Sequence, residues 1–314
     1  MPGEIDISVI IPVSERFDAV RELYGDYRKG LAPTGLRFEF IYVIDGEYPD
    51  VVEALKALQR EGEPITIVKL AKWFGEATAL TAGFSQARGE KLLTLPAYYQ
   101  VEADDLPRLV EALDRYDIAI ARRWPRIDAG INQFQSRVFH GLLNFLAGSA
   151  FHDLGCGARA LRRAVVDEVQ IYGDQHRFLP LLASRYGFRI IEVELRQSPK
   201  DAHRRVYRAG VYLRRILDIL TVFFLVKFTK KPLRFFGLVG SATFGVGALI
   251  ITVLVVERLF FGVSLAERPA LLLSSLLVVL GAQLFALGLI GELIIFTHAR
   301  QIKEYTIAEI INGP

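Results

Sequence analysis

Residues 7–13 read Ile7-Ser-Val-Ile-Ile-Pro-Val13, a short run rich in β-branched residues and punctuated by a proline. A second run of the same kind, Phe38-Glu-Phe-Ile-Tyr-Val-Ile44, ends at the pair Asp45-Gly46. Short and nearly continuous apolar runs are typical of strands that are buried on both faces of a parallel sheet. The two runs therefore predict the first strands of such a sheet, each opening into a loop at its carboxyl end.

The next part of the chain alternates in the same way. Apolar runs predict strands over 65–70, 91–95 and 117–121, and helical spacing predicts helices over 18–29, 50–61, 76–88 and 106–116. Strands that alternate with helices indicate right-handed βαβ units, whose ligands bind at the carboxyl ends of the strands. We therefore expect functional residues in the loops after Val13, Ile44, Leu70, Leu95 and Ala121.

The chain changes character after Lys231. The runs 235–256 and 270–291 contain no charged residue, and about 22 helical residues are enough to cross a hydrocarbon core of about 30 Å. They predict a membrane-spanning helical hairpin. Ahead of them, residues 211–228 place apolar side chains at helical spacing opposite basic ones. This pattern favours an amphipathic helix in the membrane interface, with a helix packed on the soluble domain as the alternative.

Composition and charge limit the remaining possibilities. With 314 residues, 52% of them hydrophobic, and a mean hydropathy of +0.29, the chain has room for one sizeable soluble core and a small membrane part. A net charge of +3 gives no indication of a nucleic-acid partner. Basic residues flank the two apolar runs on the side of the termini, so we expect both termini and the soluble domain to be cytoplasmic. We see no signal peptide, and the single cysteine, Cys156, excludes an internal disulfide.

Six motifs follow one another along the chain. They are Val9-Ile-Ile-Pro-Val13, Val43-Ile-Asp-Gly46, Trp73-Phe-Gly-Glu76, Asp153-Leu-Gly-Cys-Gly157, Arg177-Phe-Leu-Pro180 and Lys231-Pro-Leu-Arg-Phe-Phe-Gly237. In order and spacing they resemble the family 2 glycosyltransferases, within the polyprenyl-phosphate branch that includes dolichol-phosphate mannose synthases and GtrB-like bacterial enzymes. The resemblance spans nearly the whole chain.

The resemblance implies a GT-A fold, a Rossmann-like and mostly parallel α/β sheet domain, followed by an amphipathic interface helix and two transmembrane helices. The implied boundaries are 1–208 for the glycosyltransferase domain, 209–231 for the interface helix, 232–298 for the hairpin and 299–314 for a cytoplasmic tail. The implied reaction is an inverting transfer of a sugar from a nucleotide sugar to a polyprenyl phosphate lipid, at the cytoplasmic face of the inner cell membrane. A homo-oligomer, specifically a tetramer, is implied as well.

This reaction sets its own chemical requirements. The acceptor phosphate is already an anion at neutral pH, so no side chain has to remove a proton from it. The departing nucleotide diphosphate and the acceptor phosphate both need cations, and the planar fork of arginine matches phosphate. By resemblance, Arg122, Arg177 and Arg205 are the expected catalytic residues. The residues expected at the acceptor phosphate are Arg122, Arg123, Arg137 and Arg205.

The nucleotide pocket departs from the family pattern at several positions. The residues expected to line it are Pro12, Val13, Glu15, Asp45, Trp73, Gly75 and Ala97. Glu15-Arg16 stands where the family has Asn-Glu, and Trp73 where it has an asparagine. Asp45 is the candidate for binding the edge of the base, with a simple turn-forming Asp-Gly as the alternative. Trp73 either stacks on a base or fills the core.

The metal motif departs furthest. The strand ending at Leu95 should run into Asp-x-Asp, which would bind Mg²⁺ or Mn²⁺ through carboxylate oxygens, but Pro96-Ala97-Tyr98 follows instead. Either Gln100, Glu102 and Asp104 hold the metal, or the acidic residues are charges at the start of a helix and the metal site is lost. The second case leads to the alternative of a pseudo-glycosyltransferase that binds lipid, nucleotide or a partner without catalysis. A processive polysaccharide synthase is disfavoured, because we find no Gln-x-x-Arg-Trp motif.

Overall fold

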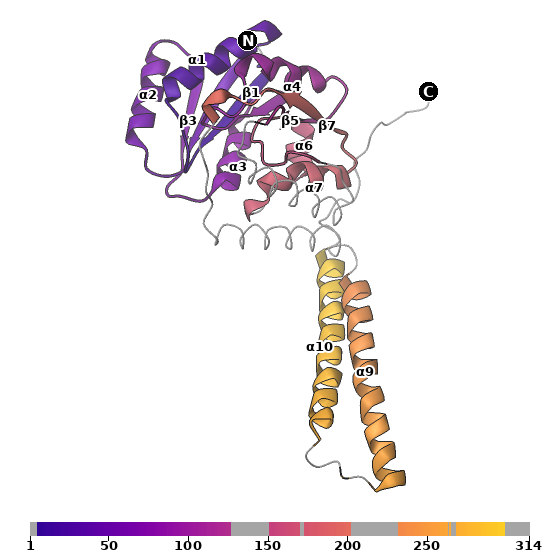
Figure 1. Cartoon of the computed structure of the whole chain (residues 1–314). Coiled ribbons are helices and arrows are strands. Elements are labelled where there is room, and N and C mark those ends of the chain that lie inside the picture. The colour runs from indigo at the N-terminus through magenta and orange to yellow at the C-terminus, as the bar shows by residue number, and fades with distance from the viewer. Residues whose placement is uncertain are drawn as a thin grey trace. The chain divides into compact units, whose positions relative to one another are not determined.

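The computed structural model describes residues 5–126, 151–169, 173–201, 232–262, 264 and 268–298. The chain divides into two compact units, Met1–Val222 and Phe223–Pro314. Figure 1 shows the sheet and helices of the first unit and the long helices of the second. The predicted interface helix (209–231) and cytoplasmic tail (299–314) lie outside the described residues, so those two boundaries stay predictions.

A mixed sheet forms the centre of the first unit. Its seven described strands follow the order β3-β2-β1-β4-β6-β5-β7. They are β1 (Ile7–Val13), β2 (Phe38–Ile44), β3 (Ile65–Lys69), β4 (Lys91–Thr94), β5 (Ile118–Arg123), β6 (Arg159–Arg162) and β7 (Ile190–Leu195). Among these, β6 runs antiparallel to both of its neighbours, and all the other pairs are parallel. Two antiparallel steps restore the direction, so β1 to β5 and β7 all end at the same edge, here called the carboxyl edge.

Strand order locates a crevice at this edge. β1 pairs with β2 on one side, up to Val13 opposite Ile44, and with β4 on the other. The chain passes from β1 to β2 and β3 and then returns to the other side of β1 for β4. The connections therefore diverge between β1 and β4, and such a switch point is where open α/β sheets bind ligands. The loops 14–19 and 95–101 follow these two strands.

Helices cover both faces of the sheet. Ile7, Val9, Ile11 and Val13 belong to one buried cluster with apolar residues of α1 (Val20–Leu31), α2 (Pro49–Arg60) and α4 (Leu106–Ala112). On the opposite face α3 (Glu76–Gln86) approaches so closely that a Cβ on Gly83 would clash with the Ile10 side chain. The shorter described elements are η1 (Ala32–Thr34), η2 (Ala103–Asp105), α6 (Arg163–Glu168), η3 (Gly173–Phe178), α7 (Leu179–Arg185) and η4 (Pro199–Asp201). The result is a layered α/β/α domain, as predicted.

The second unit is a helical hairpin. Its helices, α9 (Pro232–Phe261) and α10 (Pro269–His298), have 30 residues each and run side by side (Figure 1). Both are long and apolar enough to span a membrane, and only 17% and 11% of their most apolar stretches are buried. An apolar helix so little covered by protein is not the core helix of a soluble domain. The two predicted spans are therefore confirmed as membrane-span candidates.

Small residues bring the two helices together. A Cβ on Gly240 would lie 2.7 Å from the backbone nitrogen of Phe285, and one on Gly281 would lie 2.7 Å from the carbonyl oxygen of Gly240. The two backbones approach closely at these glycines but not at Gly245, whose Cβ would meet open space. Close backbone approach is how helices associate in lipid, where no hydrophobic force drives them together.

Glu292 connects the two helices at one end of the hairpin. Its Oε2 atom accepts a hydrogen bond of 3.4 Å from the backbone N–H of Leu233, in the first turn of α9. The first N–H groups of a helix have no partner within the helix. A carboxylate of α10 thus satisfies a backbone donor of α9 at the end of the hairpin.

The glycine contact predicts a difference between two alanine substitutions. Gly281→Ala should destabilise the hairpin by about 1–3 kcal/mol, because the new Cβ must push the two backbones apart. Gly245→Ala is the matched control, since it adds the same atom where nothing lies within 4 Å. The measurement is the mole fraction of dodecyl sulfate at the unfolding midpoint of the hairpin in mixed micelles. Equal midpoints for the two variants would contradict the packing described.

Candidate active site

The carboxyl edge gathers most of the residues expected from the sequence. At or just after β1 to β5 lie Pro12, Val13, Glu15, Asp45, Trp73, Gly75, Ala97, Gln100, Glu102, Asp104, Arg122 and Arg123. Arg177 lies in η3, which meets the first turn of α3 through an ion pair of 3.2 Å between Glu76 and His176. Arg137 and Arg205 lie outside the described residues.

Asp45 fixes the loop that leads into α3. Its carboxylate is fully buried, and its two oxygens accept hydrogen bonds from the backbone N–H groups of Phe74 (2.7 Å) and Gly75 (2.8 Å). Gly75 has a φ of 97°, a conformation that residues with a side chain rarely adopt. The carboxylate therefore holds a neighbouring loop rather than only its own turn. A contact between Asp45 and a nucleotide base stays a prediction.

Both tryptophans of the chain are exposed at this edge. Trp73 follows β3 and is 58% exposed, and Trp124 follows β5 and is 53% exposed. The core-filling alternative for Trp73 is therefore wrong. An exposed indole at the ends of the strands is free to meet a ligand, and stacking on a base stays a prediction.

The backbone after β4 is pinned from α1. The hydroxyl of Tyr27 donates hydrogen bonds to the carbonyl oxygens of Pro96 (3.0 Å) and Tyr98 (3.2 Å). The carbonyl oxygen of Ala97 accepts one from the backbone N–H of Asp18 (2.8 Å), and its side chain is buried in the core. Burial raises the pKa of Tyr27 well above its usual value, so the hydroxyl stays protonated and can donate. The loop in the place of the metal motif is thus a rigid part of the domain.

Two cations lie on two adjacent tyrosines of this loop. The Cζ atom of Arg16 is 3.8 Å from the ring centroid of Tyr98, and the Nζ atom of Lys200 is 3.9 Å from that of Tyr99. The hydroxyl of Tyr99 also donates to Asp26 (2.8 Å). Both distances are within the range of cation–π attraction. Positive charge therefore stands where the family pattern has carboxylates.

A buried ion network lies behind these cations. The Nε and Nη2 atoms of Arg123 bind the two oxygens of Asp153 at 2.7 and 2.9 Å, and its Nη1 is 3.4 Å from Asp201. Burial raises the pKa of the Asp153 carboxyl, but the hydrogen bonds and charge of Arg123 outweigh it and leave the pKa below its usual value. Arg123 is thus committed to two carboxylates. Its predicted contact with an acceptor phosphate receives no support from this geometry.

Arg122 has the opposite environment. Its Nη1 lies 3.1 Å from the exposed carboxylate of Glu194 on β7, and its guanidinium lies 5.2 Å from the ring centroid of Trp124. The side chain is 29% exposed. Of the two neighbouring arginines, Arg122 is the one that a ligand at the carboxyl edge can reach.

The predicted metal ligands are not brought together. The Oε1 atom of buried Gln100 accepts a hydrogen bond from the backbone N–H of Gly157 (2.7 Å), and its Nε2 donates to the hydroxyl of Tyr98 (3.3 Å). Glu102 and Asp104 lie near Arg196. The pKa of Arg196 is raised first by its hydrogen bond to Asp105 and further by the negative charges of Glu102 and Asp104.

This geometry favours the interpretation of Glu102 and Asp104 as charges at the start of a helix. Among the described residues, no three or more His, Cys, Asp or Glu side chains are grouped to hold a metal ion. Pro96 and Ala97 have no side-chain oxygen, and Tyr98 lies under a guanidinium. The donor set at this position therefore does not fit Mg²⁺ or Mn²⁺, which prefer carboxylate oxygens.

A buried arginine positions the segment that contains Arg177. Arg159 donates hydrogen bonds to the carbonyl oxygens of Cys156 (3.1 Å), Leu154 (2.8 Å) and Arg177 (3.4 Å), and to that of His176. Burial lowers the pKa of Arg159 to about 10. One side chain thus ties the loop 153–157 to η3. Arg159 lies two residues after the motif that ends at Gly157, but its backbone partners could not be read from the sequence.

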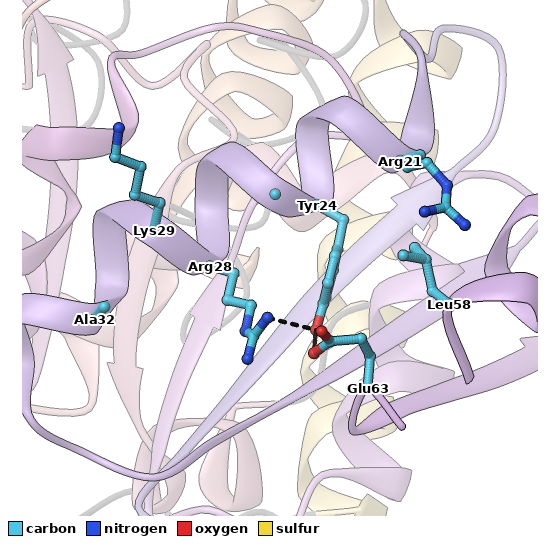
Figure 2. Close-up of a pocket in the computed structure, with 8 residues that line it drawn as sticks. Arg21, Tyr24, Arg28, Lys29, Ala32, Leu58 and Glu63 are labelled. Atoms are coloured by element: carbon cyan, nitrogen blue, oxygen red, sulfur yellow. Dashed lines mark hydrogen bonds and ion pairs between the residues drawn. The ribbon is translucent and has the colours of Figure 1, made fainter. Parts of the chain in front are cut away.

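The surface pocket shown in Figure 2 lies elsewhere. It has a volume of about 480 Å³ and lies along the outer side of α1, closed by Leu58 and Glu63. Glu63 accepts hydrogen bonds from Arg28 (2.7 Å) and from the Tyr24 hydroxyl (2.6 Å). Glu63 precedes β3, so this pocket reaches the amino end of the sheet. The arginines that line this pocket, Arg21 and Arg28, are paired with Glu61 and Glu63. The pocket is not part of the candidate active site.

The Glu76–His176 pair predicts a pH dependence of stability. Burial raises the pKa of Glu76, but the hydrogen bond and charge of His176, with nearby arginines, lower it from 4.5 to about 2. A lowered folded-state pKa stabilises the fold above pH 4.5, and this stabilisation is lost as the pH falls toward 2. Glu76→Gln should therefore lower the Tm near pH 7 by about 2–4 °C, for a contribution of about 1 kcal/mol at a partly exposed site. The difference from the unsubstituted protein should shrink between pH 4.5 and 3.

The control for this measurement is Glu47→Gln, which changes an exposed carboxylate on the same sheet edge. It should leave the Tm unchanged at every pH. A Tm difference for Glu76→Gln that is constant from pH 7 to pH 3 would rule out the ion pair as its cause.

Several known proteins resemble this chain in sequence. Glycosyl transferase family 2 matches residues 8–170. Undecaprenyl-phosphate 4-deoxy-4-formamido-L-arabinose transferase of Klebsiella pneumoniae (strain 342) is 30% identical over 313 residues, covering 98% of this chain and 94% of that protein. The enzyme of the same name from Pseudomonas aeruginosa (strain LESB58) is 30% identical over 318 residues, covering 99% of this chain and 92% of that protein.

Solved structures show the same fold. Glucosyl-3-phosphoglycerate synthase from Mycobacterium tuberculosis, in complex with Mn²⁺, uridine diphosphate and phosphoglyceric acid, aligns with a TM-score of 0.51 at 16% identity, covering 70% of this chain and 78% of that one. The complex of the same enzyme with Mg²⁺ and uridine diphosphate aligns with a TM-score of 0.51 at 15% identity, covering 70% of this chain and 79% of that one. The expected GT-A fold is thereby confirmed. A match over more than half of its length, with relatives 30% identical over nearly all of it, shows that the chain belongs to glycosyl transferase family 2.

Proposed function

We propose that the protein transfers a sugar from a nucleotide sugar to a polyprenyl phosphate and so forms a lipid-linked sugar. One observation supports this above the others: the identity to undecaprenyl-phosphate sugar transferases extends over 98% of the chain and includes both apolar helices. A soluble acceptor would not require such a hairpin. The sheet domain and the hairpin together suit a reaction that joins a soluble donor to a lipid.

The reaction follows from the charges of its partners. The bond between the anomeric carbon and the diphosphate oxygen breaks, and its electron pair leaves with the nucleoside diphosphate. A bond forms between the same carbon and an oxygen of the lipid phosphate. Attack from the side opposite the leaving group inverts the configuration. No proton moves, because the attacking oxygen is already ionised, so the protein supplies cations and orientation rather than a base.

The two substrates occupy different parts of the carboxyl edge in this proposal. The nucleotide enters the switch point between β1 and β4, with Trp73 and Asp45 on the side of the base. The acceptor phosphate meets Arg122, with Arg137 and Arg205 beside it as the resemblance implies, and Arg177 is a further catalytic residue. A divalent cation is named in the glucosyl-3-phosphoglycerate synthase structures. The described residues of this chain do not fit one, and the proposed transfer relies on the arginines of the chain itself.

The membrane arrangement is part of the same proposal. Residues 1–208 form the transferase domain, 209–231 an interface helix, 232–298 the hairpin and 299–314 the tail. Basic residues lie on the terminal side of both apolar runs, which supports a domain and termini in the cytoplasm and an acceptor in the inner membrane. A homo-oligomer, a tetramer, is proposed on resemblance alone.

Incubation with labelled donors tests the activity itself. The full chain in liposomes should transfer label from one member of a panel of radiolabelled nucleotide sugars to undecaprenyl phosphate. The product is measured as label that partitions into organic solvent. Label in the lipid would exclude the pseudo-glycosyltransferase alternative. Nucleotide binding without lipid-linked label across the panel would refute the proposal.

Arg122 provides a test of the acceptor site. Arg122→Gln should raise the KM for polyprenyl phosphate roughly 10- to 100-fold, because a charged hydrogen bond contributes about 1.5–3 kcal/mol. The Tm should not change, since the partner Glu194 is exposed. The matched control is Arg189→Gln, which removes another exposed arginine next to β7, paired with Asp117. If Arg122→Gln and Arg189→Gln give the same KM, Arg122 does not bind the acceptor.

A further inference from the structure

One side chain crosses the switch point between β1 and β4. Arg16 comes from the loop after β1, and Tyr98 comes from the loop after β4. The guanidinium carbon lies 3.8 Å from the ring centroid, although the two residues are 82 positions apart in sequence. A positive charge is thus fixed in the crevice where a parallel sheet of this topology binds its ligand.

The position of this guanidinium is built by the surrounding domain. Nη1 and Nη2 of Arg16 each lie 3.2 Å from the Oδ1 atom of Asp201, which is itself held by Gln197 (2.9 Å) and by Arg123. On the other side, the Tyr98 hydroxyl accepts a hydrogen bond from Gln100. The side chain of Arg16 is 22% exposed. An arginine ordered in advance does not lose its conformational freedom when a ligand binds.

The charge of Arg16 is only partly neutralised. Both of its terminal nitrogens share a single oxygen of Asp201, and the second oxygen of that carboxylate is occupied by Arg123 and Gln197. One carboxylate thus faces two guanidinium groups. The strong form of an arginine pair has two parallel bonds to two different oxygens, as Arg123 has with Asp153. Arg16 lacks this arrangement in the described residues, so it can still bind an anion.

The chemistry of the loop after β4 points the same way. Mg²⁺ and Mn²⁺ prefer carboxylate oxygens, and none of Pro96, Ala97 and Tyr98 has a carboxylate. Two buried carboxylates of this region, Asp153 and Asp201, are already bound by arginines, and the carboxylate of Asp18 accepts a hydrogen bond from the backbone N–H of Tyr99. Within the part of the chain that the structure describes, the site therefore offers an anion a cation that belongs to the chain and offers a metal ion no group of ligands.

We infer that Arg16, held against Tyr98, binds the diphosphate of the nucleotide donor and replaces a divalent cation in this protein. The inference rests on the proposed function for its reaction but not for its binding site. When the anomeric C–O bond breaks, negative charge grows on the departing diphosphate, and the fixed guanidinium stabilises it. The guanidinium acts by charge and hydrogen bonding and transfers no proton, so the step needs no co-reactant.

Calorimetry in the presence of a chelator tests this inference. The full chain in detergent micelles is titrated with inorganic pyrophosphate and with the diphosphates of uridine, guanosine, cytidine, adenosine and thymidine. We expect at least one nucleoside diphosphate to bind in EDTA, with an affinity that changes less than about twofold when Mn²⁺ replaces EDTA. A twofold change in affinity corresponds to a much smaller free energy than one charged hydrogen bond contributes.

Two substitutions examine the residue itself. Arg16→Gln should weaken this binding roughly 10- to 100-fold, the loss expected for one charged hydrogen bond or more. Arg21→Gln is the matched control and should bind normally, since Arg21 is an exposed arginine of α1 paired with Glu61. Tyr98→Leu keeps the charge but removes the ring, and it should give a smaller loss. The Tm of each variant shows whether it is folded.

Binding that EDTA abolishes and Mn²⁺ restores would overturn the inference, and this result needs no variant. Normal binding by a folded Arg16→Gln protein would also overturn it. The transfer assay separates this inference from the proposed function. Transfer that requires Mn²⁺ would keep the function and refute the role of Arg16. Diphosphate binding in EDTA that depends on Arg16, without any lipid-linked product, would support the site and refute the function.

Discussion

The buried pair between Arg123 and Asp153 is the interaction on which the candidate active site depends. Its two parallel hydrogen bonds join the end of β5 to the loop 153–157, and a third contact from Arg123 reaches Asp201 in η4. Removing one partner of such a buried pair typically costs about 3–5 kcal/mol, because the other charge is left without compensation. Asp201 in turn fixes Arg16 at the switch point. The cation in the crevice is therefore placed by a chain of contacts that begins in the interior of the domain.

Strand geometry explains why two neighbouring arginines differ so much. Successive side chains of a strand point to opposite faces. Arg123 points toward the buried carboxylates, whereas Arg122 points toward exposed Glu194 of the neighbouring strand. Both side chains carry the same charge, but Arg123 is bound by buried carboxylates of the domain, whereas Arg122 is available to a ligand. Whether each arginine is bound inside the domain or available to a ligand depends on the face of the sheet to which it points. The sequence Arg122-Arg123 does not show which residue points to which face.

The limits of prediction follow the same logic. Alternating apolar runs and helical spacing correctly predicted β1 to β5 and α1 to α4, because these depend on local patterns. The location of the site at the carboxyl edge stays a prediction. The same patterns missed β6, a four-residue strand that begins and ends with arginine, whose pairing with β4 and β5 is long-range. They also could not decide the environment of Trp73, which is exposed rather than buried. Contacts such as that of Arg16 with Tyr98 join residues far apart in sequence, and only the register of the sheet brings them together.

A built-in arginine and a cluster of metal-binding carboxylates differ most in their effect on the stability of the domain when no ligand is bound. Carboxylates gathered to hold a divalent cation repel one another in its absence, and they remain ionised only at a cost in stability. Arg16 has Asp201 as a partner before any ligand arrives, so its charge is partly compensated among the described residues even when the switch point is empty. When a diphosphate binds, the guanidinium can keep its contact with Asp201 and use its remaining N–H groups, since it has five donors. The same residues can thus stabilise both the empty domain and the bound anion, and this double role accounts for a cation that is built into the crevice rather than recruited to it.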